Sequence, residues 1–195
     1  LKAKTMKKQL KSLAAIALAC FVAFGFSSCK KDEPKQITYG FQNSIAFNSE
    51  IVDMLNITFE LTDIEGKTTT TNINDCPTKE VTYAGKTRKM YVFNKLETTI
   101  NKPTESKLSI KFEPNGRIPA SGSVDLYVIQ DFYVGGYDNG NWDTGASKET
   151  GIVFWGERSV ADAEEASMLA TSLNMAFGKF TLKIGESGGS SISKK

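Results

Sequence analysis

The sequence predicts a mainly β protein, a single antiparallel β-sandwich of the immunoglobulin-like or jelly-roll-like kind with one short helix near the C-terminus. Apolar and polar residues alternate with period two through most of residues 36–186, as they do in strands with one buried face. Residues 160–173 break that period and have a helical pattern instead. About 150 residues are enough for one domain with its own core. A closed, lipocalin-like barrel with the helix packed outside is the alternative.

The clearest strand is the stretch LNITFELTD, residues 55–63. Its apolar residues occupy every second position, so they share one face of the strand: Leu55, Ile57, Phe59 and Leu61. Glu65-Gly66-Lys67 then turns the chain, and the threonine-rich stretch 68–75 returns beside it. The two stretches therefore predict a β-hairpin.

Further strands are predicted by the same alternation, or by short apolar runs between turn residues. They cover residues 36–47, 89–97, 106–112, 150–156 and 174–186. Residues 123–134 differ because they are apolar on both faces. A strand covered on both sides lies in the middle of a sheet, so this segment is predicted to be central.

The one predicted helix follows Ser159. Ser159 with Asp162 three residues later resembles the start of a helix with a capping box. The next residues are rich in alanine, which favours helix, and carry a narrow apolar stripe ending at Leu173. A narrow stripe predicts a helix lying across a sheet edge or a barrel mouth.

The N-terminal residues have the layout of a secretory signal. Lys7, Lys8 and Lys11 form a basic head, and residues 12–26 form an apolar run of 15 residues. Such a run spans about 22 Å as a helix, short of the roughly 30 Å of a bilayer core. Residues 1–5 precede the first methionine and are read as upstream of the true start.

The end of this signal, Phe26-Ser27-Ser28-Cys29, resembles the lipobox of bacterial lipoproteins. The resemblance implies that Cys29 takes a diacylglyceryl thioether with acyl chains such as palmitate. The family prefers leucine where Phe26 stands. The charged residues 30–33 also resemble the signal that sends Bacteroidota lipoproteins to the outer face of the outer membrane. The expected organisation is a signal over 1–28, a lipidated tether over 29–35, a β domain over 36–186 and a flexible Gly/Ser tail over 187–195.

Composition excludes several classes of function. The chain has no histidine, which removes histidine-based triads and histidine metal ligands. Five of the 24 Lys and Arg and none of the 22 Asp and Glu precede Cys29, so the chain from Cys29 onward has a net charge of about −3. It has no basic excess for nucleic acid. Cys76 is the one cysteine beyond Cys29, and it is read as a half-buried structural thiol.

The segment 131–149 is unlike its surroundings, because it combines aromatic residues with Gly, Asn and Asp. Exposed aromatic rings suit the apolar faces of sugars, and carboxylates suit their hydroxyls. The candidate ligand-binding residues are Tyr137, Asp138, Trp142 and Asp143. The alternative is a structural hairpin whose aromatic rings fold back onto the core.

Calcium is a second alternative for this segment. Asn139, Asn141 and Asp143 have the 1-3-5 spacing of an EF-type loop. The pattern then fails, because Thr144 stands where glycine is required and Thr150 where the bidentate glutamate belongs. No other cofactor is indicated, and no metal site is assigned firmly.

The resulting expectation is a non-catalytic binding module, lipid-anchored in the outer membrane and facing the cell exterior. The module would bind a glycan or another nutrient ligand, or would serve as an accessory to an uptake complex. An adhesion or structural protein acting through protein contacts is the alternative. A carboxylate-based hydrolase is the third class, and the sequence has no recognisable motif for it.

The lipid anchor can be tested directly. We expect mass spectrometry of the N-terminal peptide to show a chain that begins at Cys29 and carries the thioether lipid and an N-acyl chain. Cys29→Ser is the control and should remain unmodified. An unmodified Cys29, or a chain that begins elsewhere after processing, would show that the lipobox interpretation is wrong.

Overall fold

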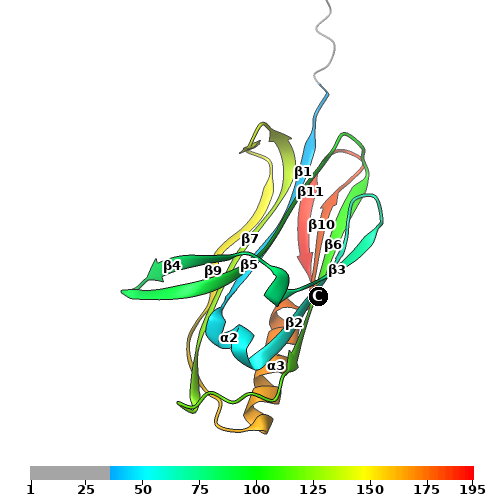
Figure 1. Cartoon of the computed structure of the whole chain (residues 1–195). Coiled ribbons are helices and arrows are strands. Elements are labelled where there is room, and N and C mark those ends of the chain that lie inside the picture. The colour runs from blue at the N-terminus through cyan, green and yellow to red at the C-terminus, as the bar shows by residue number, and fades with distance from the viewer. Residues whose placement is uncertain (1–35) are drawn as a thin grey trace, which may run out of the picture. The chain divides into compact units, whose positions relative to one another are not determined.

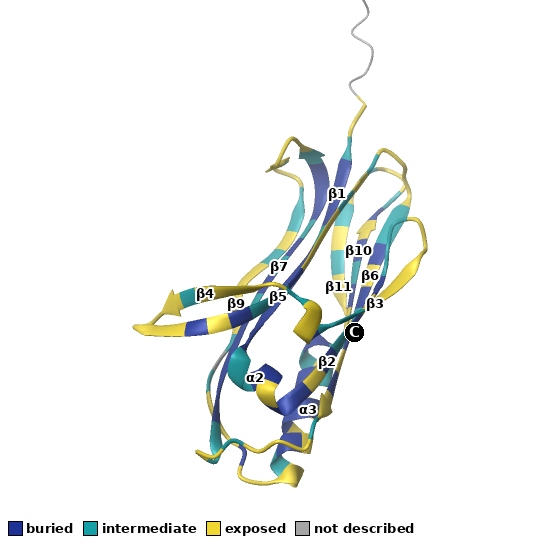
Figure 2. Cartoon of the chain, viewed as in Figure 1, coloured by how far each residue is buried: buried dark blue, intermediate teal, exposed yellow. Residues whose placement is uncertain are grey.

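Two antiparallel β-sheets lie face to face in the computed structural model, which describes residues 36–195 (Figure 1). The predicted mainly β sandwich is confirmed, with a helix near the C-terminus. The strands form two separate sheets, one of them curled like half a barrel, and not one closed barrel. The buried residues lie along the facing sides of the sheets, whereas the hairpin that projects from the first sheet is largely exposed (Figure 2).

The first sheet has the order β4-β5-β1-β7-β8, and β9 also pairs with β7. Its strands are β1 (Tyr39–Asn48), β4 (Thr78–Tyr83), β5 (Lys86–Thr99), β7 (Ser123–Asp138), β8 (Asn141–Trp142) and β9 (Ser147–Ser159). The strand β7 pairs with β1 on one side and with β9 on the other. The prediction that residues 123–134 form a central strand is therefore confirmed.

The second sheet has the order β11-β10-β6-β2-β3. Its strands are β2 (Leu55–Thr62), β3 (Thr68–Asn72), β6 (Thr104–Pro114), β10 (Lys179–Ile184) and β11 (Ser190–Lys194). The predicted hairpin is confirmed, with Leu61 opposite Thr69 and Gly66 at a φ of 80° in the turn. A residue without a side chain adopts that conformation at least cost.

Aromatic rings fill the space between the sheets. Phe47 of the first sheet meets Phe112 of the second edge-on, with ring centroids 5.3 Å apart. Two pairs stack at 4.3 Å across the same space: Phe59 with Phe93, and Phe132 with Phe180. Such pairs contribute about 0.5–1.5 kcal/mol each beyond the area they bury, so they favour one alignment of the sheets.

Several short elements were not predicted from the sequence, among them the strand β4, a short helix and a 3-10 turn. The helix α2 (Ser49–Met54) joins β1 to β2, and the 3-10 turn η1 (Ile73–Asp75) follows β3. Six residues are too few to establish a helical period. Ile51, Val52 and Met54 are buried, so packing against the core stabilises this short helix.

The C-terminal helix α3 (Ala163–Phe177) starts and ends later than predicted. Its N-cap is Asp162, whose carboxylate accepts a hydrogen bond of 2.8 Å from the Glu165 amide, so the cap predicted at Ser159 is wrong. Glu165 in turn accepts from the Ala161 amide at 2.7 Å. At the other end, the strand predicted from residue 174 begins only at Lys179.

The residues predicted as a flexible tail include a strand. Residues 190–194 form β11, which pairs with β10 from Phe180 opposite Lys194 to Ile184 opposite Ser190. Ile192 packs against the core. Its single apolar side chain among serines was too weak a signal to distinguish a strand from a tail.

The predicted signal, the lipidation site Cys29 and the tether over 29–35 lie outside the described residues. Within residues 36–195, no helix combines the length and apolar character needed to cross a bilayer.

Cys76 is half-buried beside the core, as the sequence predicted. Its thiol lies 3.7 Å from the carbonyl oxygen of Asn72 and can donate to it. Burial raises the pKa of the thiol, and the carboxylate of Asp75 adds to the effect. The thiol is thus held in its weakly reactive protonated form.

We expect Cys76→Ser to fold and to lose about 1–3 kcal/mol of unfolding free energy, because the serine hydroxyl sits on a shorter bond than the thiol and does not reach the Asn72 carbonyl, which the thiol contacts at 3.7 Å. Urea denaturation monitored by circular dichroism measures this loss. Wild-type Cys76 should react slowly with a thiol reagent at pH 7. Loss of folding in the variant, or rapid modification of the native protein, would contradict the structural assignment.

Candidate functional site

The segment singled out in the sequence forms a tight β-hairpin at the end of β7. Tyr137 pairs with Trp142, and Asp138 pairs with Asn141. The two turn residues, Asn139 and Gly140, have φ values of 48° and 91°. Positive φ at both positions is the signature of the type I′ turn that Asn-Gly favours.

The hairpin brings three aromatic rings together on one face of the first sheet. The Trp142 ring stacks on Tyr133, with centroids 5.3 Å apart and an interplanar angle of 18°. Tyr137 lies 4.8 Å from Trp142 at a tilt of 56°. Trp142 also lies directly over Gly40, where an added Cβ atom would be 2.7 Å from the ring. The absence of a side chain at Gly40 in β1 therefore leaves the room that the indole ring occupies.

Two carboxylates lie beside this aromatic cluster. Asp143 accepts a hydrogen bond of 3.0 Å from the Gly145 amide, and its other oxygen lies against Gly136, which has no side chain to displace it. Asp138 accepts from the Asn139 side chain at 3.0 Å. Both aspartates are exposed. They can thus accept hydrogen bonds from a ligand while the hairpin remains closed.

The structure places the four predicted ligand-binding residues in this one hairpin. Tyr137 and Trp142 touch, and both are half-buried, whereas Asp138 and Asp143 are exposed. Tyr133 completes the cluster but was not among the predicted site residues. Its position four residues before Tyr137 on the same strand face was the signal that could have identified it.

The residues considered for calcium are arranged differently from an EF-type loop. Asn139 and Asn141 lie in and beside the two-residue turn, and the Asn141 side chain donates to the Asn139 carbonyl at 3.5 Å. Asp143 accepts from a backbone amide. Between residues 36 and 195, no three Cys, Asp or Glu side chains are grouped so that they could hold a metal ion.

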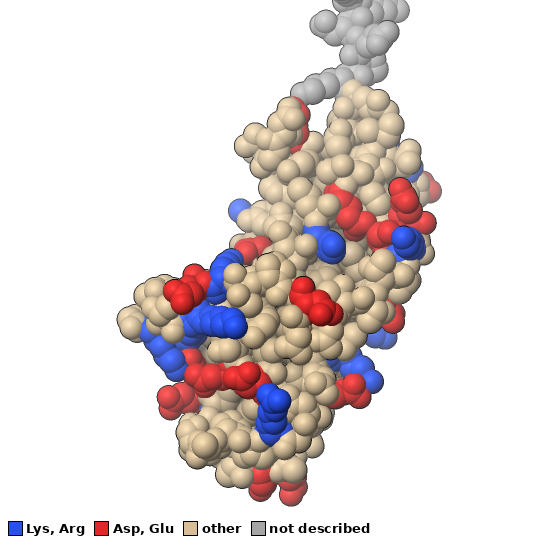
Figure 3. Space-filling view, viewed as in Figure 1, with Lys and Arg blue, Asp and Glu red and all other residues tan. Residues whose placement is uncertain are grey.

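The aromatic hairpin lies at the end of the sandwich where the described chain begins. The Tyr137 amide donates to the Thr38 carbonyl at 2.9 Å. Ile37 is 56 % exposed, and Ile100, which follows the Thr99 partner of Tyr39, is 51 % exposed. The visible face at this end carries few charged side chains (Figure 3). The cluster therefore lies at an end of the sandwich that combines exposed apolar side chains with the exposed carboxylates of Asp138 and Asp143.

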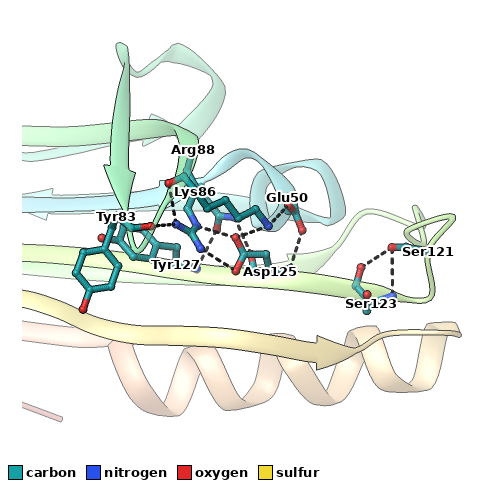
Figure 4. A network of polar contacts seen from close by, with 9 residues as sticks. Glu50, Tyr83, Lys86, Arg88, Ser121, Ser123, Asp125 and Tyr127 are labelled. Carbon is teal, nitrogen blue, oxygen red and sulfur yellow. Dashed lines mark hydrogen bonds and ion pairs between the residues drawn. The ribbon is translucent and has the colours of Figure 1, made fainter.

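A second cluster, which the sequence did not indicate, surrounds Asp125 on β7 (Figure 4). Arg88 donates to its carboxylate through Nε at 2.6 Å and through Nη2 at 3.3 Å. Lys86 lies 2.9 Å from the same carboxylate. Glu50 of α2 accepts from the Asp125 amide at 2.6 Å, and the Arg88 guanidinium lies over the Tyr127 ring.

These contacts attach the β4–β5 hairpin and α2 to the central strand. Burial alone would raise the pKa of Asp125, but hydrogen bonds from Arg88 and Lys86 outweigh it and hold this pKa below its usual value. The same carboxylate raises the pKa of both partners. Asp125 is therefore ionised and fully engaged, which makes this cluster a structural clamp.

Comparison with protein-family models, with curated proteins and with solved structures found no match for this chain.

We expect Asp125→Asn to lower the free energy of unfolding by about 3–5 kcal/mol, because it leaves the buried Arg88 charge without its counterion. Chemical denaturation at pH 7 measures the loss. The control is Glu113→Gln, which breaks the exposed Lys111–Glu113 pair and should cost less than about 1 kcal/mol.

The pH dependence gives an independent test of the same clamp. Because the folded-state pKa of Asp125 is depressed, its stabilisation is complete above the unfolded-state value of about 3.9 and is lost as pH falls through the folded-state pKa. Stability of the wild type should thus decline below about pH 4, and more steeply than that of Asp125→Asn. Equal acid slopes would show that the carboxylate does not clamp the hairpin.

Proposed function

We propose that this chain is a cell-surface lipoprotein that acts as a tethered, non-catalytic binding module for a glycan or another nutrient ligand. The aromatic hairpin carries the proposal: Tyr137 and Trp142 lie in contact beside two exposed carboxylates. Aromatic rings stack on the apolar faces of sugars, and carboxylates accept hydrogen bonds from their hydroxyls. A rigid sandwich presents these groups on a loop, as binding proteins commonly do.

The anchor is proposed from the resemblance of Phe26-Ser27-Ser28-Cys29 to a lipobox, and the outward location from the charged residues 30–33. Only nine residues, 30–38, separate Cys29 from the hydrogen bond between Thr38 and Tyr137. At most about 3.5 Å per residue, they reach roughly 30 Å. The aromatic hairpin would thus be held close to the membrane, which favours a role as accessory to an uptake complex embedded there.

An adhesion role through protein contacts is the second candidate, and one observation favours it. Met168 and Met175 of α3 are 63 % and 79 % exposed and lie seven residues apart, on the same helical face. Flexible methionines on a surface are suited to contacts with other proteins. Such a role would use α3 and not the aromatic hairpin.

A glycan array probed with the full chain tests the binding role. We expect Trp142→Ala and Asp138→Asn each to weaken binding of the ligand found by about tenfold, which corresponds to about 1.4 kcal/mol. Asp138→Asn keeps a side-chain oxygen that can accept from Asn139 and has nearly the same shape, so it should change the melting temperature little. Tyr83→Ala removes a ring that is 41 % exposed on the β4–β5 hairpin and is the control.

Binding that survives both hairpin substitutions would exclude this hairpin as the site. Absence of any ligand on the array, together with protein partners whose capture is lost in Met168→Lys, would favour the adhesion role instead.

A further inference from the structure

The outer face of the second sheet contains a hollow of about 610 Å³. It lies beside the C-terminal end of α3, on the opposite side of this sheet from the core. The residues that line it come from six elements and their ends: Thr58, Glu60, Thr70, Ser109, Ile110, Lys111, Asn174, Gly178, Lys179 and Lys195. This volume is within the range of about 300–1,000 Å³ typical of small-ligand sites.

The strand register builds the floor of the hollow. Glu60 is opposite Thr70 on one side and Ser109 on the other, and Ser109 is opposite Lys179. Four polar side chains therefore form a row across β3, β2, β6 and β10, about 4.8 Å apart. They face outward because their neighbours along the strands, such as Phe59 and Phe180, are buried in the core.

The wall next to α3 is held firmly. The Asn174 side chain accepts from the Phe112 amide at 3.0 Å and donates to the Phe112 carbonyl at 2.8 Å. The Ile110 amide donates to the Gly178 carbonyl at 2.9 Å. The end of the helix is thus fixed to β6 before any ligand arrives, which reduces the ordering that binding requires.

Charge in the hollow is mainly positive. Among side chains, Lys111, Lys179 and Lys195 contribute three ammonium groups, against the one side-chain carboxylate of Glu60. Lys111 already forms an ion pair with Glu113 at 2.8 Å. Lys179, in contrast, has no carboxylate within ion-pair distance among residues 36–195. An anionic ligand group would therefore find an uncommitted cation beside the hydroxyl of Ser109.

We propose that this hollow binds a saccharide that carries a carboxylate, a uronic acid unit of an acidic glycan. The sugar carboxylate pairs with Lys179 and Lys111, and the ring hydroxyls hydrogen-bond to Thr58, Ser109 and Glu60. The lining has no aromatic ring, so stacking of a neutral sugar contributes nothing there. One carboxylate and three hydroxyl-bearing residues distinguish it from a simple phosphate site.

The experiment is a titration of the ¹⁵N-labelled protein with trigalacturonate, with neutral maltotriose as the matched ligand. We expect trigalacturonate to shift the amide signals of Ser109, Gly178 and Lys179, and maltotriose to leave them unchanged. Lys179→Gln should weaken binding about tenfold. Lys183→Gln, which removes an exposed lysine from the same strand but outside the hollow, should change it less than twofold.

Three results would overturn the proposal: no shift with millimolar trigalacturonate, equal shifts with maltotriose, or equal losses in the two lysine variants, which would indicate unspecific attraction. The variant Trp142→Ala distinguishes binding in the hollow from binding at the aromatic hairpin. It should leave trigalacturonate binding intact, so failure of the function proposed for the hairpin and failure of this site would be distinguishable.

Discussion

The structure depends on one constraint: the apolar faces of its two sheets, one of them curled, must pack against each other across a single core. The central strand β7 carries most of this constraint, because Leu126 and Val128 face the core while Asp125 and Tyr127 on its other face are also buried. A strand buried on both sides needs partners on both sides. The second sheet packs against the inner face of β7. The β4–β5 hairpin curls over the outer face of β7 and covers it. The buried carboxylate of Asp125 holds that curl in place.

Local periodicity was sufficient to predict most of this architecture. The alternation of Leu55, Ile57, Phe59 and Leu61, and the two apolar faces of residues 123–134, each report a burial pattern that the structure contains. Sequence reasoning failed where an element is defined by what it packs against. The helix α2 has six residues, and Ile192 is the apolar residue of β11 that packs against the core, so tertiary packing and strand pairing stabilise both elements.

The candidate sites show the same limit more sharply. The composition of residues 131–149 predicted where the aromatic cluster lies in the sequence. It did not predict that Trp142 packs on Gly40, a residue about a hundred positions away. Asp125 likewise lies 37 positions from Arg88 and 75 positions from Glu50, the residues to which it is hydrogen-bonded. The row from Thr70 to Lys179 exists only after four strands have paired. Such groupings follow from strand register, which a single sequence leaves open until the sheet order is known.

The sandwich separates its surfaces by physical character. The end at which the described chain begins combines the aromatic hairpin with exposed Ile37 and Ile100, whereas the outer face of the second sheet is polar and positively charged near Lys179. If Cys29 carries a lipid, a tether of a few residues holds the first surface toward the bilayer and leaves the second free along the side of the domain. A ligand captured at the side and a partner met at the membrane would then use different faces of one rigid scaffold. Under the proposed function, this arrangement would let the domain hold a soluble ligand and a membrane-bound partner at the same time, because the two surfaces do not overlap.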